Sequence, residues 1–260
     1  MTRLQKNISW LAFLCLGFNP VFSPAFAQNG GVTTVAAKLP AVQQAAALLA
    51  QGLPQQAQAV LTNVPSTSPD YALGKDYAAL SQYALGDKRG FLKAAESGSA
   101  DKSLLPADLQ ESFDFDQIAS LFFYRRFDKL LTQTLAFSAN HAGSPRSQSV
   151  TEYELAALYE RGMKKLVEAS ILTDTNQANA RGTTGCNDLV IYLTLASDFK
   201  TNCYQVLTNR SLKEEVWKAQ MALGNEQSVV QALSQPNTNE VEKLAWLSMT
   251  AMFSTARMIC

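Results

Sequence analysis

The feature that most constrains this chain is the helical spacing of its apolar residues, which recurs along most of its length. Behind Pro54, four apolar residues stand at positions i, i+3, i+4 and i+7: Ala57, Val60, Leu61 and Val64. This spacing places them on one face of an α-helix, and proline fits the first turn of a helix. Because apolar residues repeat with the helical period instead of alternating as in strands, the sequence predicts an all-α fold.

A second pattern is an internal match. Gly52 and Gly86 are 34 residues apart, and the residues around them align. The aligned pairs are Ala45 with Ala79, Ala46 with Leu80, Leu49 with Tyr83, and Ala57 with Phe91. Segment 82–87 (QYALGD) also matches segment 220–225 (QMALGN), and looser versions of the turn surround Arg125 and Gly162. One short helical hairpin cannot bury its apolar face alone, so the repeat indicates stacked hairpins.

These residues resemble the tetratricopeptide-like (TPR-like) helical repeat family. Ala45, Gly52 and Ala57 occupy the places of that family's small helix-A residue, turn glycine and small helix-B residue. The resemblance is best over residues 40–97, and it implies a right-handed solenoid of antiparallel helical hairpins over residues 40–260. Later units depart from the pattern, because Phe91 and Val229 replace the small helix-B residue and the family's closing proline is missing or displaced.

Local signals predict where several helices begin and end. Thr151 with Glu154, and Ser211 with Glu214, match the capping box, so we expect a helix to begin at each. Segments rich in Gly, Ser, Asn, Thr or Pro predict loops at 65–70, 97–103, 138–149, 173–185 and 235–239. We expect a last amphipathic helix, near residues 241–256, to cap the open end of the stack.

The first 27 residues have the order of a secretory signal peptide. Two basic residues precede a short apolar run, and Ala25-Phe26-Ala27 supplies a small-residue cleavage pattern. We expect residues 1–27 to be removed on export, residues 28–39 to form a flexible leader, and the mature protein to be periplasmic or secreted. Later stretches fall short of the roughly 18 uncharged apolar residues of a membrane helix, which predicts no stable membrane insertion after cleavage.

Three of the four cysteines follow that segment, namely Cys186, Cys203 and Cys260. The predicted compartment permits disulfides, and the short separation favours a bridge between Cys186 and Cys203, although either can instead pair with Cys260. A closed loop of that size stabilises a protein by about 3 kcal/mol in the chain-entropy model. The predicted bridge is therefore a structural staple.

Composition argues against several classes of function. The chain has 22 basic and 22 acidic residues, so it lacks the basic footprint of a nucleic-acid-binding protein. His141 is its only histidine, which weakens both a catalytic triad and a zinc site, and its polar loop predicts a solvated side chain. We therefore predict no catalytic residue, no metal ligand and no cofactor.

Two local clusters are candidate sites. The acidic residues Glu111, Asp114 and Asp116 can form a carboxylate cleft, but helix-start and solvated roles explain them more simply. The aromatic-basic run over residues 121–127 (LFFYRRF) contains Tyr124, which with the arginines can hold a peptide or a carboxylate. In the alternative interpretation, the phenylalanines fill the core and the arginines lie at its wet edge.

The repeat register predicts a concave surface for a protein partner. Besides Tyr124, its candidate residues are Asp76, Tyr83, Tyr159, Lys218 and Met221. Aromatic and methionine side chains on such a face suit a peptide, although they can also simply join neighbouring hairpins. We expect an exported adaptor or assembly factor that binds another protein in the cell envelope. The alternatives are an envelope enzyme or enzyme subunit with a carboxylate cleft, and a secreted effector that binds a host protein.

Overall fold

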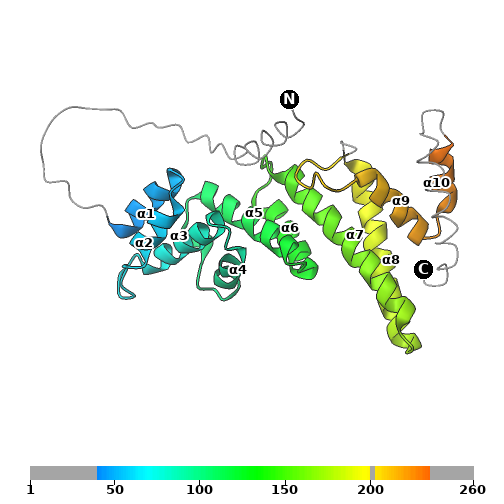
Figure 1. Cartoon of the computed structure of the whole chain (residues 1–260), viewed down its shortest axis with the longest axis horizontal. Coiled ribbons are helices and arrows are strands. Elements are labelled where there is room, and N and C mark those ends of the chain that lie inside the picture. Colours follow the sequence, from blue (N-terminus) through cyan, green and yellow to red (C-terminus); the bar gives the residue numbers. More distant parts are fainter. Residues whose placement is uncertain (1–39, 200–202, 235–260) are drawn as a thin grey trace, which may run out of the picture.

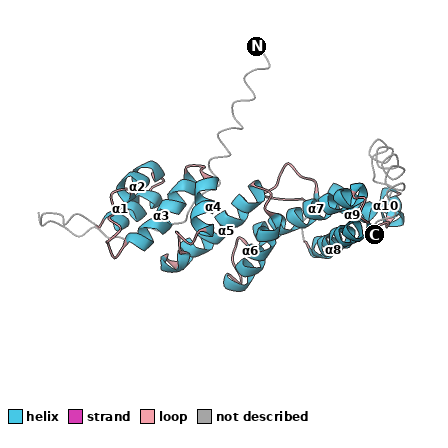
Figure 2. Cartoon of the chain, turned by 90° about the horizontal axis from the view of Figure 1, so that it is seen from below, coloured by secondary structure: helices cyan, strands magenta, loops and turns pink. Residues whose placement is uncertain are grey.

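The computed structural model describes residues 40–199 and 203–234, and these residues fold into ten α-helices and one short 3-10 helix, without any strand. The helices follow one another along an elongated row, from α1 at one end to α9 and α10 at the other (Figures 1 and 2). The predicted all-α fold is confirmed. In chain order the elements are α1 (Ala41–Ala50), α2 (Pro54–Leu61), α3 (Tyr71–Ala84), α4 (Lys88–Glu96), η1 (Lys102–Leu104), α5 (Ala107–Phe123), α6 (Phe127–Asn140), α7 (Ser147–Ile171), α8 (Thr175–Asp198), α9 (Leu212–Ala222) and α10 (Glu226–Leu233).

Four helical hairpins share one three-residue turn: α1–α2, α3–α4, α5–α6 and α9–α10. In the α3–α4 turn, the Gly86 N–H donates to the Tyr83 carbonyl at 2.9 Å and the Asp87 N–H donates to the Gln82 carbonyl at 2.8 Å. This is the Schellman arrangement, which satisfies carbonyls at the end of a helix and needs a positive φ at its central residue. The central residues are Gly52, Gly86, Arg125 and Gly224, with φ of 72°, 84°, 55° and 77°.

Arg125 is the only non-glycine residue with a positive φ in the described part of the chain. The left-handed conformation costs an L-residue about 1 kcal/mol that glycine avoids. Its ion pair with Glu160, at 2.5 Å, offsets little of this because the Arg125 side chain is 67% exposed. We expect Arg125→Gly to raise the melting temperature, followed by circular dichroism, by about 1–3 °C.

The matched control is the reverse change at the equivalent turn. A Cβ at Gly86 meets no atom within 4 Å, so Gly86→Ala tests the backbone conformation alone. It should lower the melting temperature, since alanine tolerates the positive φ poorly. A lower melting temperature for Arg125→Gly would contradict the prediction.

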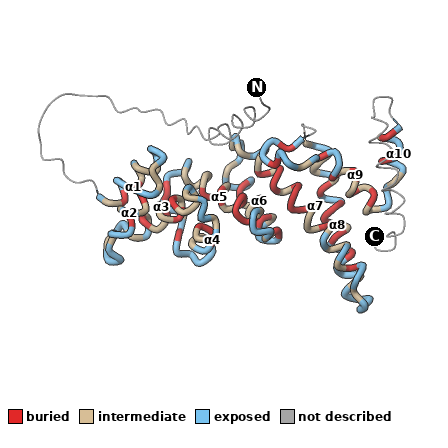
Figure 3. The backbone as a smooth tube through the Cα atoms, viewed as in Figure 1, coloured by how far each residue is buried: buried red, intermediate tan, exposed pale blue. Residues whose placement is uncertain are grey.

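The buried core runs along the whole row, as the red segments of Figure 3 show. One apolar cluster joins α1 through α5, a second joins α4 through α9, and a small third cluster lies between α9 and α10. Helix α5 contributes to the first two: Phe113 packs on Phe91 in the first cluster, with ring centroids 4.8 Å apart, and Ile118 is fully buried in the second. Helix α5 therefore connects the interiors of the first two clusters.

The middle of the chain departs from the predicted repeat. Helices α7 and α8 form a long hairpin of 25 and 24 residues. Gly162, which the sequence suggested as a turn, lies inside α7, where an added Cβ would come within 2.9 Å of Leu189 Cδ2 and 3.1 Å of the Gly185 carbonyl oxygen. This glycine allows close packing of two helices instead of a change of direction.

Two predicted boundaries in the same region are wrong. The loop predicted at 173–185 belongs almost entirely to α8, which Asp174 caps by accepting a hydrogen bond from the Gln177 N–H at 2.9 Å. Thr151 lies inside α7, and its hydroxyl donates to the Ser147 carbonyl at 3.0 Å. The prediction at Ser211 is confirmed, because its hydroxyl accepts from the Glu214 N–H at 3.3 Å and α9 begins at Leu212.

The predicted disulfide is absent from the described residues, since no bond joins Cys186 to Cys203 there. Cys186 lies within α8, and the helix continues to Asp198, which carries the chain roughly 18 Å along the axis before the segment that holds Cys203. Sequence separation alone does not reveal this rise. Cys260, the signal peptide (1–27), the leader (28–39) and the capping helix near 241–256 lie outside the described residues. In the part that is described, no helix is both long and apolar enough to cross a membrane.

Candidate interaction site

A groove of about 520 Å³ lies between α4 and the α5–α6 turn. Helix α4 begins here because the Asp87 carboxylate accepts a hydrogen bond from the Gly90 N–H at 2.8 Å, and it turns Phe91 and Leu92 into the protein. Arg89 and Lys93, one helical turn apart, remain exposed. We call this the α4 groove; its lining residues are Arg89, Leu92, Lys93, Glu96, Ser97, Tyr124 and Arg126.

The aromatic-basic run forms the other wall of the α4 groove, and both interpretations of it hold in part. Phe127 is buried and packs with the half-buried Phe122 in the core. Phe123 and Tyr124 are 62% and 38% exposed, and their rings meet edge to face with centroids 5.1 Å apart. Lys88 Nζ lies 4.7 Å from the centre of the Phe123 ring. The turn therefore presents two aromatic rings to solvent beside several cations.

The charges along the α4 groove do not balance. Glu96 pairs with Arg126 at 2.6 Å and with Lys129 at 2.9 Å. Partial burial acts to raise the pKa of Glu96, but the hydrogen bonds from these two cations outweigh it and lower the pKa. Among the described residues, Arg89 and Lys93 make no ion pair with any carboxylate. The groove thus offers two cations without counter-ions next to an exposed tyrosine.

Two of the three acidic residues of α5, Asp114 and Asp116, are buried and Glu111 is half-buried, contrary to the predicted solvated role. Asp114 is 4% exposed, and its carboxylate binds Lys102 of η1 and lies 2.9 Å from His141 Nε2. Glu111 accepts a hydrogen bond from the Ser144 hydroxyl at 2.7 Å. His141 is itself only 14% exposed, so its prediction as a solvated histidine is wrong. The loop between α6 and α7 folds back over α5, a long-range contact that local composition does not reveal.

The third carboxylate of this group, Asp116, is 8% exposed. Burial raises its pKa to about 7, although Arg146 and the Tyr83 hydroxyl favour its charged form. The α5 carboxylates are thus engaged by other side chains of this chain. This arrangement favours a role in holding helices together over a substrate cleft.

Asp76 of α3 is fully buried, and neither of its carboxylate oxygens has a hydrogen-bond partner within the described residues. Burial raises its pKa to about 6. Asp76 was predicted to contact a partner, and its burial corrects that prediction. The repeat register placed it on the groove face, whereas α3 turns it toward the packed interior.

The raised pKa values of Asp76 and Asp116 predict that the free energy of unfolding declines as pH rises. Both folded-state pKa values, about 6 and about 7, exceed the ordinary value near 3.8, so the folded protein binds these protons more tightly than the unfolded chain. Their contribution is complete below about pH 4 and is lost as pH rises through 6 to 7. We expect Asp76→Asn to raise the free energy of unfolding at about pH 8 by about 1–2 kcal/mol and to flatten its pH dependence.

Urea denaturation between about pH 5 and pH 8 measures this effect. Asp70→Asn removes an exposed carboxylate just before α3 and should leave the slope with pH unchanged. A wild-type slope in Asp76→Asn would show that this carboxyl group does not titrate as expected.

The other predicted partner-binding residues do not gather on one surface. Met221 is 2% exposed, in a small apolar cluster between α9 and α10, so its predicted contact with a partner is also corrected. Tyr83 and Tyr159 are half-buried against Phe91 and Tyr192, with ring centroids 5.4 Å and 5.5 Å apart.

Two predicted residues keep exposed atoms at separate places. Lys218 lies 3.4 Å from Glu214 on α9, far along the row from the aromatic-basic turn. Tyr124 lines the α4 groove. Sequence reasoning missed Arg89 and Lys93, because nothing local to α4 indicates that an aromatic turn more than 30 residues later lies beside it.

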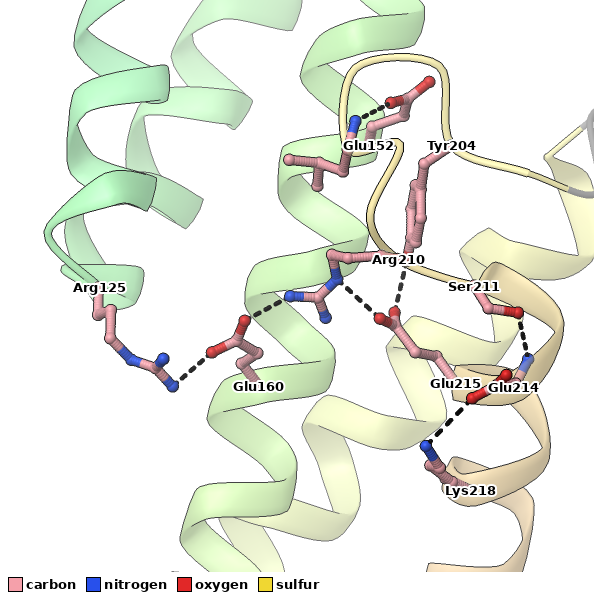
Figure 4. A network of polar contacts seen from close by, with 10 residues as sticks. Arg125, Glu152, Glu160, Tyr204, Arg210, Ser211, Glu214, Glu215 and Lys218 are labelled. Atoms are coloured by element: carbon pink, nitrogen blue, oxygen red, sulfur yellow. Dashed lines mark hydrogen bonds and ion pairs between the residues drawn. The ribbon is translucent and has the colours of Figure 1, made fainter. Parts of the chain in front are cut away.

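A polar network links the α5–α6 turn to α9 (Figure 4). Glu160 of α7 lies between the guanidinium groups of Arg125 and Arg210. Arg210 Nε also donates to Glu215 at 2.7 Å, and Glu215 accepts a further hydrogen bond from the Tyr204 hydroxyl at 2.7 Å. The network thereby joins the turn that lines the α4 groove to a distant part of the row.

Glu152 holds the segment before α9 against α7. Its side chain is fully buried, and its carboxylate accepts hydrogen bonds from the backbone N–H groups of Gln205, Val206 and Leu207, at 2.7, 2.6 and 3.4 Å. Figure 4 shows Glu152 on α7 with one of these bonds drawn as a dashed line. Backbone donors that gather around one buried carboxylate leave few unsatisfied groups in the segment.

Within the described residues, no group of three or more His, Cys, Asp or Glu side chains is arranged to hold a metal ion. Comparison of the chain with protein-family models, with curated proteins and with solved structures finds no match.

Proposed function

We propose that this chain is an exported TPR-like helical-repeat protein, a right-handed solenoid of hairpins, that acts as a protein–protein interaction adaptor or assembly factor in the cell envelope. The export signal and the repeated Schellman turn support the two structural parts of the proposal. The α4 groove carries the functional part, because exposed Tyr124 stands there beside the unpaired cations Arg89 and Lys93.

The composition of the α4 groove suits a protein partner. Tyrosine and arginine are the residues most often found at the energetic centres of protein interfaces, since they offer both apolar area and polar groups. Here Tyr124 and Arg126 lie against a floor that includes the buried Leu92. A partner segment lying in the groove would cover apolar surface and satisfy the free cations together.

Site-specific photocrosslinking tests the proposal. A photoreactive residue at Tyr124, in the full chain exported by its native host, should capture the same envelope protein in repeated experiments. Leu135 on α6, which is 68% exposed and outside the α4 groove, is the matched control position. Capture should disappear in an Arg89→Glu/Lys93→Glu background. If Tyr124 captures nothing that Leu135 does not capture, the proposal is wrong.

The alternatives make different predictions. A carboxylate-cleft enzyme would lose turnover when Glu111 and Asp116 are changed to amides, yet both are already engaged inside the fold. A secreted effector would use the same groove on a host protein. Following the cleaved product between periplasm and culture medium separates the effector from a resident adaptor.

A further inference from the structure

The surface around the α4 groove concentrates positive charge in a chain that is neutral overall. Four cations, Arg89, Lys93, Arg126 and Lys129, lie at this place, and one carboxylate, Glu96, is shared by the last two. The whole chain has equal numbers of acidic and basic residues, so the excess is local. Charge of this kind attracts a partner whose matching segment is acidic.

The spacing of the two unpaired cations matches an extended peptide. Arg89 and Lys93 are four residues apart on α4, which places their Cβ atoms about 5–6 Å apart on one helix face. Side chains two residues apart on an extended strand point the same way and are separated by about 6.5 Å. Two carboxylates at that spacing can therefore meet the two cations together, with the guanidinium favouring a bidentate contact.

The apolar part of the α4 groove gives a second constraint. Leu92 is 4% exposed at its floor, and the Tyr124 ring forms a wall that remains 38% exposed. A partner side chain placed between them would be apolar or aromatic, because ring contacts add to the area buried.

We propose that the α4 groove binds an extended acidic segment of a partner protein. In this complex two carboxylates, two residues apart, meet Arg89 and Lys93, and an apolar side chain of the segment lies against Leu92 and Tyr124. The inference rests on the proposed function and adds the chemical class of the partner. An anionic membrane fits less well, because the Glu96 carboxylate lies within the groove and disfavours a continuous sheet of negative charge.

Selection from a random peptide library tests this assignment. Displayed peptides of about ten residues are enriched on the folded chain, and the enriched sequences should carry Asp or Glu at positions two apart with an apolar neighbour. The variant Arg89→Glu/Lys93→Glu should enrich basic residues at those positions. The control Lys164→Glu/Lys165→Glu makes the same charge change on α7 and should enrich the wild-type sequences.

The best enriched peptide then allows affinity to be measured by fluorescence anisotropy. We expect the α4 variant to weaken its binding by about tenfold or more, and the α7 control by less than about twofold. Circular dichroism melts of both variants exclude loss of folding as the cause of a change.

Several results would overturn the acidic-segment assignment. These are enrichment without any preference for acidic residues, identical sequences from the wild type and the α4 variant, or binding of anionic phospholipid vesicles without peptide enrichment. The adaptor proposal is tested separately, by the crosslink at Tyr124. A partner captured there, without enrichment of acidic peptides, would support the adaptor function and contradict only the acidic-segment assignment.

Discussion

Replacing Glu152 by alanine should lower the free energy of unfolding by about 3–5 kcal/mol. The change leaves three backbone N–H groups without their acceptor. The hydrogen bond from Leu207 is buried and those from Gln205 and Val206 are part-buried, and an unsatisfied buried donor costs about 1–3 kcal/mol. The side chain is fully buried, so water cannot replace the carboxylate without opening the segment before α9. Urea denaturation followed by circular dichroism measures the loss, and amide hydrogen exchange at Gln205 and Val206 should accelerate.

A nearby glutamate supplies the control for this prediction. Glu154 lies on the same helix, and burial raises its pKa, so its charged form is disfavoured in the fold. Glu154→Ala should therefore change stability by less than about 1 kcal/mol. If Glu152→Ala costs no more than Glu154→Ala, the carboxylate does not anchor the segment.

Introducing valine at Gly162 should destabilise the α7–α8 hairpin by about 3 kcal/mol or more. An added Cβ would already lie 2.9 Å from Leu189 Cδ2 and 3.1 Å from the Gly185 carbonyl oxygen, so the two helices must separate. The same holds in reverse, because a Cβ at Gly185 would lie 2.9 Å from the Gly162 carbonyl oxygen. Thermal denaturation should show a melting temperature lower by about 6 °C or more.

Alanine stabilises a helix interior by about 1 kcal/mol relative to glycine, yet we expect even Gly162→Ala to destabilise the protein. Gly74 in α3 is the matched control, because a Cβ there would make only ordinary van der Waals contacts, at 3.5–3.9 Å, with side-chain atoms of Val42, Leu61 and Val64. Gly74→Ala should be neutral or stabilising. A stabilised Gly162→Ala protein would mean that the helices do not approach as closely as described.

The parts of the fold that sequence predicted are those with local causes. The turns at Gly52, Gly86 and Gly224 depend on one residue that accepts a positive φ and on helix ends next to it, so an internal match identifies them. The α9 start at Ser211 is likewise a contact across one helical turn. Such features depend only on residues that are close together in the sequence.

The parts that sequence missed depend on contacts between distant segments. Composition marked residues 173–185 as a loop, but its glycines lie inside α8, and Gly185 lets that helix approach α7. Tertiary packing there overrides a weak local preference for helix.

The candidate site shows the same division. Tyr124 could be proposed from its aromatic-basic run. Arg89 and Lys93 could not, because they become part of a groove only when folding places the α5–α6 turn beside α4. Asp76 failed as a groove residue because a small error in helical register rotates a side chain from the surface into the interior.

Helix α5 has a thermodynamic consequence for the whole row. Since Phe113 belongs to the apolar cluster of the first helices and Ile118 to that of the later ones, neither half can melt without exposing apolar side chains of a helix that the other half requires. Denaturation should then be cooperative across the described helices, and a calorimeter should record one endotherm where independent modules would give two.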